Sequence, residues 1–399
     1  PTSVFLCGAK GVGKSTLCRF TVNSWLGQEW CSKVAVLDCD LGQPELGPPG
    51  VVGLYVVDKP LLGPPHTHLQ HAHTAFFCGA TSPQADPELF ARAVVAACDV
   101  YRAEVARDGN VPLVVNTNGW VRGLGLDLLA RVLAHVCPAH VLQLQGSSYN
   151  RTFAITLPPK VWAPLGQLLP SVPALHTLTA WNDLPASAPS GAPTKNIMRS
   201  PTDLRALRIM CYFLTAERWK LDGAETRNAT VGRQSVGYAL ASLVPLSVPW
   251  DSIRWVVTPC EVPQSQVLRV LNASIVGLLA FEPDAEAGAG AGATVPPMMV
   301  VRQAPPPPMA PCLGLGIVRS IDPVAKVLHI VTPVPPERLA PVNMLALGAS
   351  IDIPGIAMRV TGGLPEPYTT DDVVPLATIG GSVMKTRKVL KRKRFGGQQ

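Results

Sequence analysis

The residues with the clearest chemistry lie near the start of the chain. The predicted nucleotide-binding residues are Gly8, Ala9, Lys10, Gly11, Val12, Gly13, Lys14, Ser15 and Thr16. They fit the pattern G-x-x-x-x-G-K-[S/T] and lie between an apolar run and a helical pattern. The alternative is a glycine-rich turn that binds no ligand, but such a turn does not require Lys and Ser directly after its last glycine. Such a loop turns N–H groups toward a phosphate, and the helix adds positive charge. We expect Lys14 to reach the β- and γ-phosphates and Ser15 to hold Mg²⁺ through its hydroxyl.

Two carboxylates follow the next apolar run, at residues 33–37. Asp38 and Asp40 come where this strand is expected to end, and their spacing of two puts both side chains on one side. Ligands of open α/β sheets bind at that edge. We therefore expect both to face the phosphates, one steering Mg²⁺ and one accepting a proton from a nucleophile. The alternative is a pair of solvent-facing turn aspartates.

Two later strand ends carry side chains suited to a nucleic acid. Thr81 and Ser82 follow an apolar run at 75–78, and their hydroxyls either grip a phosphodiester or cap the turn. Trp120 follows the run at 112–115 in a polar, glycine-containing turn. A core position explains this tryptophan poorly, whereas stacking on a base is worth about 1–3 kcal/mol per contact.

A basic cluster lies further along the chain. Arg205 and Arg208 are three residues apart and so share a helical face. With Lys195 and Arg199 they form a group that we expect to fold over the nucleotide as a lid and neutralise charge during transfer. A solvated helix face is the alternative.

The elements that must position these residues follow an alternating pattern. Apolar runs are expected to form strands at 4–7, 33–37, 75–78, 112–115 and 140–144, and helical patterns cover 15–25, 86–107 and 124–136. This alternation predicts an α/β fold, a P-loop NTPase-type doubly wound parallel sheet with a helical lid, followed by a smaller mostly β domain. Segment 46–65 is rich in glycine and proline and is expected to be a loop, whereas segment 158–193 is rich in loop-forming residues and indicates no particular element.

The later part of the chain changes in pattern. The short runs expected to be strands are 253–257, 267–271, 274–279, 313–318, 327–330 and 350–353. We expect a P-loop kinase domain at 1–190, a lid segment at 191–234, a C-terminal mostly β domain at 235–370 with a flexible insertion at 283–311, and a basic tail at 371–399.

Composition narrows the class of protein. Hydrophobic residues make up 47% of the 399 residues and charged residues 15%, which is typical of globular proteins. No apolar run is long enough to span a membrane, so no membrane partner is expected. The ten cysteines lack the spacing of a disulfide framework or zinc site, which favours reduced thiols. Four histidines between residues 66 and 73 fit a mobile polar loop better than a zinc site.

The charge is concentrated at the C-terminus. The formal net charge is +7, and residues 385–394 alone carry seven basic residues and no acid. Such a run indicates a nuclear or nucleolar address or a nucleic-acid patch, and a solvated tail without a partner is the alternative. The sequence begins without Met, so we expect the natural protein to extend upstream.

Several motifs in this order resemble the eukaryotic polynucleotide 5′-hydroxyl kinases, especially their nucleolar branch in pre-ribosomal RNA processing. They are the P-loop, Asp40-x-Gly42-Gln43, Asn116-Thr117-x-Gly119-Trp120, and the runs at 312–318 and 332–335. The resemblance implies ATP- and Mg²⁺-dependent phosphorylation of an RNA 5′-hydroxyl. It also implies a particle that holds a HEPN-type endoribonuclease, and residence in the nucleus and nucleolus. Family members carry a further N-terminal β domain that helps to hold adenine, and we expect the chain to lack it.

The same resemblance implies roles for single residues. Lys14 contacts the β- and γ-phosphates, Ser15 binds Mg²⁺ and Asp40 is the base toward the 5′-hydroxyl. Gln43, Thr81 and Ser82 lie on the substrate side, Trp120 stacks the terminal base, and Arg205 and Arg208 match the family's Arg-x-x-Arg-Ile helix. A nucleotide-binding scaffold of an RNA-processing complex, without phosphoryl transfer, remains the alternative, and a small-molecule or nucleoside kinase is a third.

Overall fold

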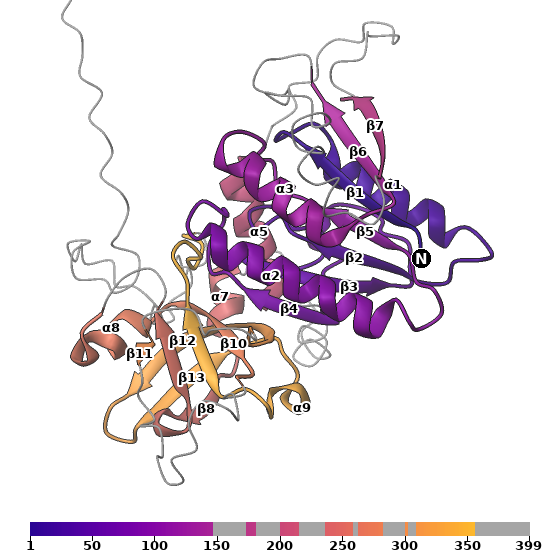
Figure 1. The fold of residues 1–399 in the computed structure, drawn as a ribbon. Helices are drawn as coiled ribbons and strands as arrows, with labels where there is room; N and C mark the ends of the chain where they lie inside the picture. The colour runs from indigo at the N-terminus through magenta and orange to yellow at the C-terminus, as the bar shows by residue number, and fades with distance from the viewer. Residues whose placement is uncertain are drawn as a thin grey trace, which may run out of the picture.

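The computed structural model describes residues 1–146, 173–180, 200–214, 236–257, 262–281, 300–301 and 309–355 (Figure 1). Lys195, Arg199, the expected basic tail and most of the expected insertion lie outside these ranges. Within them, no helix has the combination of length and apolar content that crossing a lipid bilayer requires.

The P-loop belongs to a seven-stranded sheet with the strand order β4-β3-β2-β5-β1-β6-β7. The parallel strands are β1 (Ser3–Gly8), β2 (Val34–Asp38), β5 (Leu113–Asn116), β6 (His140–Gln145) and β7 (Ala174–Thr179). The antiparallel edge pair is β3 (Val51–Val57) and β4 (Thr74–Phe77). The predicted α/β sheet is therefore confirmed, except that the strand expected at 75–78, β4, pairs antiparallel with β3 at one edge.

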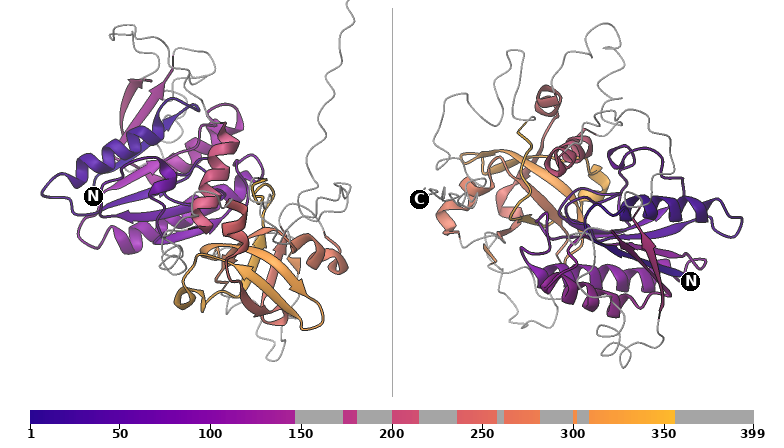
Figure 2. Two further views of the ribbon diagram at one scale, coloured as in Figure 1. Left: turned by 180° about the vertical axis from the view of Figure 1, so that it is seen from behind. Right: turned by 90° about the horizontal axis from the view of Figure 1, so that it is seen from above.

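Helices cover both faces of this sheet, which explains why its central strands are continuous apolar runs. The helices are α1 (Lys14–Leu26), α2 (Pro87–Val100) and α3 (Leu124–Val136). Figure 2 shows α1 on one face and α2 with α3 on the other. Accordingly, Leu6 packs with Cys18 and Val22 of α1, whereas Phe5 packs in the cluster that holds α2 and α3.

Two strands of this sheet were not expected. Strand β3 lies inside the segment 46–65, so the prediction that this segment is a loop was wrong. Strand β7 lies inside 158–193, where the sequence indicated no particular element. Strand β3 is a run of apolar residues, nearly all of them buried, but the glycines and prolines on either side of it favoured the prediction of a loop. The predicted start of α2 is confirmed, because the Asp86 carboxylate accepts a hydrogen bond from Leu89 N at 2.9 Å. A short π-helix, η2 (Tyr101–Val105), continues this helix.

The C-terminal part forms a second seven-stranded sheet with the order β11-β9-β14-β10-β12-β13-β8. Its strands are β8 (Leu246–Pro249), β9 (Arg254–Val257), β10 (Ile275–Leu279), β11 (Val300–Val301), β12 (Cys312–Asp322), β13 (Val327–Val331) and β14 (Met344–Leu347). Short helices accompany them: η5 (Trp250–Ser252), η6 (Gln264–Gln266), α8 (Val267–Leu271) and α9 (Pro336–Leu339).

Two predicted strands of this part are corrected. Val267–Leu271 is the helix α8, since the spacing of four puts Val267 and Leu271 on one face, where both are fully buried. Residues 350–353 are not a strand, and the strand β14 lies just before them.

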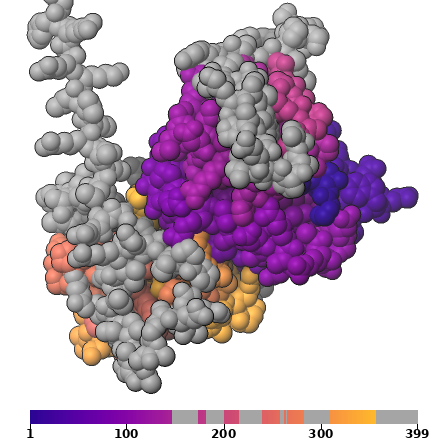
Figure 3. All heavy atoms as spheres, in the orientation of Figure 1, coloured from indigo at the N-terminus to yellow at the C-terminus, as the bar shows by residue number. Residues whose placement is uncertain are grey.

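The two sheets share an apolar core. Helices α5 (Pro201–Phe213) and α7 (Val236–Ala241) run from the first sheet to the second (Figure 1). One buried cluster joins Phe77 of β4, Phe213 of α5 and Leu315 of β12. Figure 3 shows the two parts as adjoining bodies. The sheet that carries the P-loop is therefore packed directly against the C-terminal sheet.

Candidate functional site

The P-loop connects β1 to α1 at the carboxyl edge of the first sheet. Gly13 is the residue before α1 and has φ 103° and ψ 15°, a left-handed conformation that glycine adopts without strain. Among the residues that the structure describes, no side chain caps α1, and the first turn of this helix contains no acidic residue. Because the first N–H groups of a helix have no partner within it, this end of α1 offers donors and positive potential to an anion.

Lys14 lies inside the loop. Its Nζ donates to Gly8 O at 2.8 Å and to Ala9 O at 3.0 Å, and the residue is only 7% exposed. Burial lowers the pKa of the ammonium, and the nearby charge of Asp40 opposes that shift. An ammonium has three hydrogens, so one remains for a phosphate oxygen.

Asp40 is held by one oxygen only. Its Oδ1 accepts hydrogen bonds from Gly42 N and Gln43 N, both at 3.0 Å. Its Oδ2 has no hydrogen-bond partner among the described residues, and the side chain is half-buried. Two backbone donors thus fix the carboxylate while one oxygen stays available to take up a proton.

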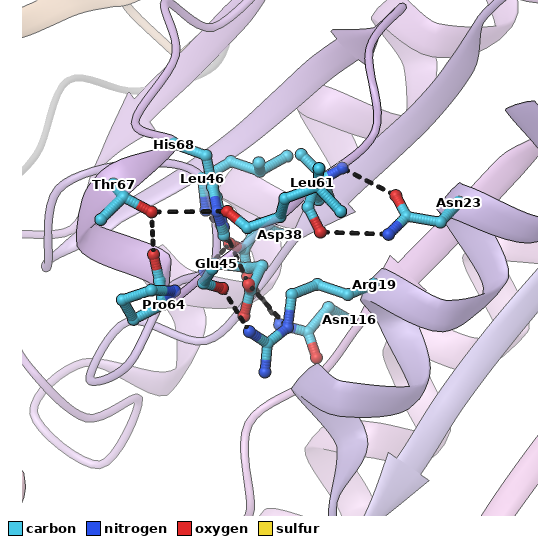
Figure 4. A network of polar contacts seen from close by, with 12 residues as sticks. Arg19, Asn23, Asp38, Glu45, Leu46, Leu61, Pro64, Thr67, His68 and Asn116 are labelled. Atoms are coloured by element: carbon cyan, nitrogen blue, oxygen red, sulfur yellow. Dashed lines mark hydrogen bonds and ion pairs between the residues drawn. The ribbon is translucent and has the colours of Figure 1, made fainter.

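Asp38 differs from Asp40, although only one residue separates them. It is 1% exposed, and its Oδ2 accepts from Glu45 N and Leu46 N while its Oδ1 accepts from Asn116 Nδ2 at 3.0 Å (Figure 4). Burial raises its pKa to about 7, and the hydrogen bond from Glu45 N opposes the rise. The expectation that both carboxylates face the phosphates is corrected for Asp38, since protein donors occupy both of its oxygens. Its predicted contact with Mg²⁺ stays a prediction that this geometry does not favour.

A buried carboxylate that the sequence reasoning missed lies beside Asp38. Glu45 is fully buried, and its Oε1 meets Arg19 Nε at 3.3 Å and His68 Nε2 at 2.9 Å (Figure 4). The signal in the sequence was an acidic residue within a stretch of proline, glycine and leucine. His68 is thus a partner of Glu45, and His73 Nε2 meets Glu104 Oε2 at 2.8 Å. In the described ranges no three His, Cys, Asp or Glu side chains are grouped to hold a metal.

Helix α5 is attached to the loop that carries Asp40. The Nε2 of Gln43 donates to Pro201 O at 2.9 Å, at the first residue of α5. Arg208 is 4% exposed, and within the described part of the chain its Nε and Nη1 have no hydrogen-bond partner. Burial lowers its pKa, and the charges of Asp38 and Glu45 oppose the shift. Arg208 therefore presents unsatisfied donors close to the carboxylates of this loop.

Arg205 has a different environment from Arg208. It is half-exposed, and its Nη2 donates to Thr202 Oγ1 at 3.3 Å within the first turn of α5. This turn is fixed by a capping box between Ser200 and Asp203. The two arginines share a helix as predicted, and their role as lid residues stays a prediction.

The turn after β4 borders the Asp40 loop. Thr81 O lies so close to Gly42 that a Cβ there would approach it to 2.8 Å. Ser82 Oγ accepts a hydrogen bond from Gln84 N at 3.3 Å, so this hydroxyl caps its turn. Thr81 is thus brought next to the predicted base, whereas contact of either hydroxyl with RNA stays a prediction.

Trp120 packs more closely than its sequence context suggested. Its ring is half-buried against the core of the first sheet and covers Gly125, where a Cβ would come within 2.4 Å of Trp120 Cγ. The expectation that a core position explains this residue poorly is corrected, and stacking on a base stays a prediction. The neighbouring Gly119 touches the P-loop, because a Cβ on it would lie 2.7 Å from Lys10 N.

The residues present fit a hydrated Mg²⁺. The ion prefers one or two carboxylates together with substrate phosphates and water. The hydroxyl of Ser15 at the start of α1 and the unengaged oxygen of Asp40 are hard donors of this kind. The site therefore combines a phosphate cradle, an ammonium, a partly free carboxylate and a buried guanidinium.

Two family models match the chain, one over the part that contains the P-loop and one over the C-terminal sheet. Residues 8–160 match the family model of the mRNA cleavage and polyadenylation factor CLP1 P-loop, and residues 241–354 match that of the NOL9-like C-terminal domain. A solved complex of wild-type Clp1p with Pcf11p has a similar fold, with a TM-score of 0.54 at 14% identity over 88% of this chain and 74% of that one.

Curated relatives are more similar in sequence. The polynucleotide 5′-hydroxyl-kinase NOL9 of Arabidopsis thaliana is 31% identical over 381 residues, which cover 94% of this chain and 92% of that protein. The protein of the same name from Homo sapiens is 31% identical over 392 residues, and that from Bos taurus is 30% identical over 388. The chain spans about half the length of these two mammalian relatives, 52% and 53%. With the plant relative matched over nearly its whole length, the chain belongs to the polynucleotide 5′-hydroxyl-kinase NOL9 family.

Proposed function

We propose that the chain transfers the γ-phosphoryl group of ATP to the 5′-hydroxyl of RNA. The names of its relatives support this reaction, and the P-loop supports the use of ATP. The observation that carries the proposal is the geometry of Asp40, which two backbone N–H groups hold through Oδ1 while Oδ2 stays available beside the P-loop.

The reaction needs positioning and charge neutralisation more than covalent chemistry. Lys14 contributes one free N–H to the β- and γ-phosphate oxygens, and the first turn of α1 contributes backbone donors. Asp40 accepts the proton of the 5′-hydroxyl as the hydroxyl oxygen bonds to the γ-phosphorus, while the bond between that phosphorus and the β,γ-bridging oxygen breaks and ADP leaves. Ser15 would hold Mg²⁺ through its hydroxyl, and the ion would neutralise phosphate charge.

Arg208 is the stronger of the two candidates for a transition-state cation. Its Nε and Nη1, which have no partner among the described residues, are buried near the Asp40 loop, so they lie in a medium where a charge interaction is stronger than in water. Arg205 would meet the nucleotide only after leaving Thr202. On the acceptor side, Gln43, Thr81, Ser82 and Trp120 are the proposed RNA contacts.

The biological setting is part of the proposal. We assign the RNA to pre-ribosomal RNA, as the product of internal transcribed spacer cleavage, and the partner to a HEPN-type endoribonuclease. The basic residues at 385–394 support residence in the nucleus and nucleolus. A Clp1p chain of similar fold is solved with a protein partner, Pcf11p, which is a precedent for partner binding by this fold.

The test is transfer of labelled γ-phosphate from ATP to a short 5′-hydroxyl RNA, beside a 5′-phosphate RNA of the same sequence. Only the hydroxyl RNA should be labelled. Asp40→Asn should lower kcat by about 10²–10⁴-fold, because an amide cannot take up the proton. Asp108→Asn, in an exposed turn, is the matched control. ATP binding without labelling of either RNA would instead support a nucleotide-binding scaffold.

A further inference from the structure

The C-terminal sheet reaches the acceptor side of the site through the segment that follows β14. Gly348, directly after β14, touches Gly79, two residues after β4. A Cβ on Gly348 would lie 2.1 Å from Gly79 O, and one on Gly79 would lie 2.4 Å from Gly348 Cα. The two backbones are thus in direct contact, which only glycines permit.

Hydrogen bonds from Ser350 extend this contact to Thr81. Ser350 N donates to Gly79 O at 3.2 Å, and Ser350 Oγ accepts from Thr81 N at 3.0 Å. The Ser350 and Thr81 hydroxyl oxygens are 3.5 Å apart. The next residue, Ile351, is 4% exposed and packs against Gly50. The segment that follows β14 therefore packs against one side of the turn that contains Gly79 and Thr81.

The other side of the same turn meets the predicted base. Thr81 O lies against Gly42, and Gly42 N is one of the two donors that hold Asp40 Oδ1. Ser350 and Asp40 are thus separated only by the Thr81 backbone and Gly42. A displacement of the turn by a few tenths of an ångström would change the space in front of the carboxylate.

We propose that Ser350 is a positioning residue for the acceptor end of the RNA, a role that rests on the proposed function. Its Oγ accepts from Thr81 N, so its own proton is free to be donated to Thr81 Oγ1. The proton of Thr81 then points away from Ser350 and is left for a phosphate oxygen of the substrate. The C-terminal sheet thereby sets the position of the 5′-hydroxyl, while the P-loop sets that of ATP.

The kinetic test compares Ser350→Ala with Ser350→Thr, which keeps the hydroxyl. Ser350→Ala should raise KM for the RNA by about three- to tenfold, as expected for one lost hydrogen bond, and leave KM for ATP unchanged. Ser350→Thr should stay within about twofold of wild type. Ser247→Ala, which removes a hydroxyl that meets His329 Nδ1 in the same sheet, is the control and should change neither constant.

A second measurement needs no catalysis. Hydrogen exchange of the free protein should show faster exchange of Thr81 N–H in Ser350→Ala than in wild type, with unchanged exchange in the Ser247→Ala control. Unchanged exchange at Thr81, or an equal rise of KM for RNA and ATP, would overturn the role of Ser350. A wild-type protein that transfers no phosphate would overturn the proposed function, and the exchange result would still decide whether Ser350 holds the turn.

Discussion

Asp38 and Asp40 show how two identical side chains take different roles through their hydrogen bonds. Four donors engage the oxygens of Asp38, namely the N–H groups of Glu45, Leu46 and Asp40 and the amide of Asn116. The second oxygen of Asp40 has no hydrogen-bond partner in the described part of the chain. We therefore assign Asp38 to the shape of the loop and Asp40 to the reaction.

This division predicts that substitutions of the two aspartates affect the free energy of unfolding differently. Asp38→Ala leaves buried donors on Glu45, Leu46 and Asn116 without an acceptor, so the free energy of unfolding should fall by about 1–3 kcal/mol or more. Asp40→Asn keeps an acceptor for Gly42 N and should leave that free energy nearly unchanged. Urea denaturation of both variants checks the prediction, and equal stability of the two would contradict it.

A second prediction at the residue scale concerns the thiol of Cys7 in β1. Burial raises its pKa from 9.0 to about 12, and the Lys14 charge opposes the rise. The folded state therefore retains this proton between pH 9 and pH 12, where the unfolded chain has lost it, so the thiol's contribution to stability declines as pH rises through that window. At pH 8.5 iodoacetamide should leave Cys7 unmodified and label the half-buried Cys137, and mass spectrometry can measure both. Equal labelling of the two cysteines would contradict this prediction.

Single residues were predictable where a short motif carries the chemistry. Lys14, Ser15 and Asp40 lie in local patterns whose geometry follows from one strand, one loop and one helix. The pairing of Glu45 with Arg19 and His68 was not predictable, because it depends on three segments meeting in space. The same applies to Ser350, which is far from Thr81 in the sequence.

At the scale of elements, the turn after β5 supports the P-loop. Gly119→Ala would place a Cβ 2.7 Å from Lys10 N, and the P-loop backbone would have to move. Overpacking of this kind typically destabilises the affected conformation by about 1–3 kcal/mol. Because the conformation affected here is that of the P-loop, Kd for ATP should rise by about tenfold. Calorimetry measures this. In Gly355→Ala, where no described residue has an atom within 4 Å of the added Cβ, Kd for ATP should stay unchanged. An unchanged Kd in Gly119→Ala would contradict the supporting role of this turn.

Strands and helices were predictable where their periodicity is long and free of interruptions. The span of α3 agrees with its apolar pattern, and Asp86 with Pro87 marked the start of α2. Strand β3 was missed because turn-forming residues dominate the segment around it. In α8, five residues were too few to separate a helical from a strand-like pattern.

At the scale of the whole molecule, the two faces of β4 belong to different cores. Phe76 packs in the cluster of the first sheet, whereas Phe77 packs in the cluster shared with the second and lies against Gly277 of β10. Such a division between sheets has no local signature, so the sequence could not predict it.

This arrangement gives a matched pair of substitutions. Phe76→Ala and Phe77→Ala should each lower the free energy of unfolding by about 3–5 kcal/mol, since both rings are buried. Only Phe77→Ala should also speed hydrogen exchange in β10, because the Phe77 ring lies against Gly277 of that strand whereas Phe76 packs in the cluster of the first sheet. Equal exchange in β10 of the two variants would contradict a shared core.

The shared cluster also determines how this protein can be cut or recombined. A fragment that ended before residue 236 would keep every predicted nucleotide-binding residue but would leave Val51, Ala75 and Phe77 without the neighbours that cover them. Apolar surface that is exposed in this way promotes self-association of the fragment. A chimera joined between the two sheets would inherit half of a core from each parent, so the two sheets form a single unit for recombination.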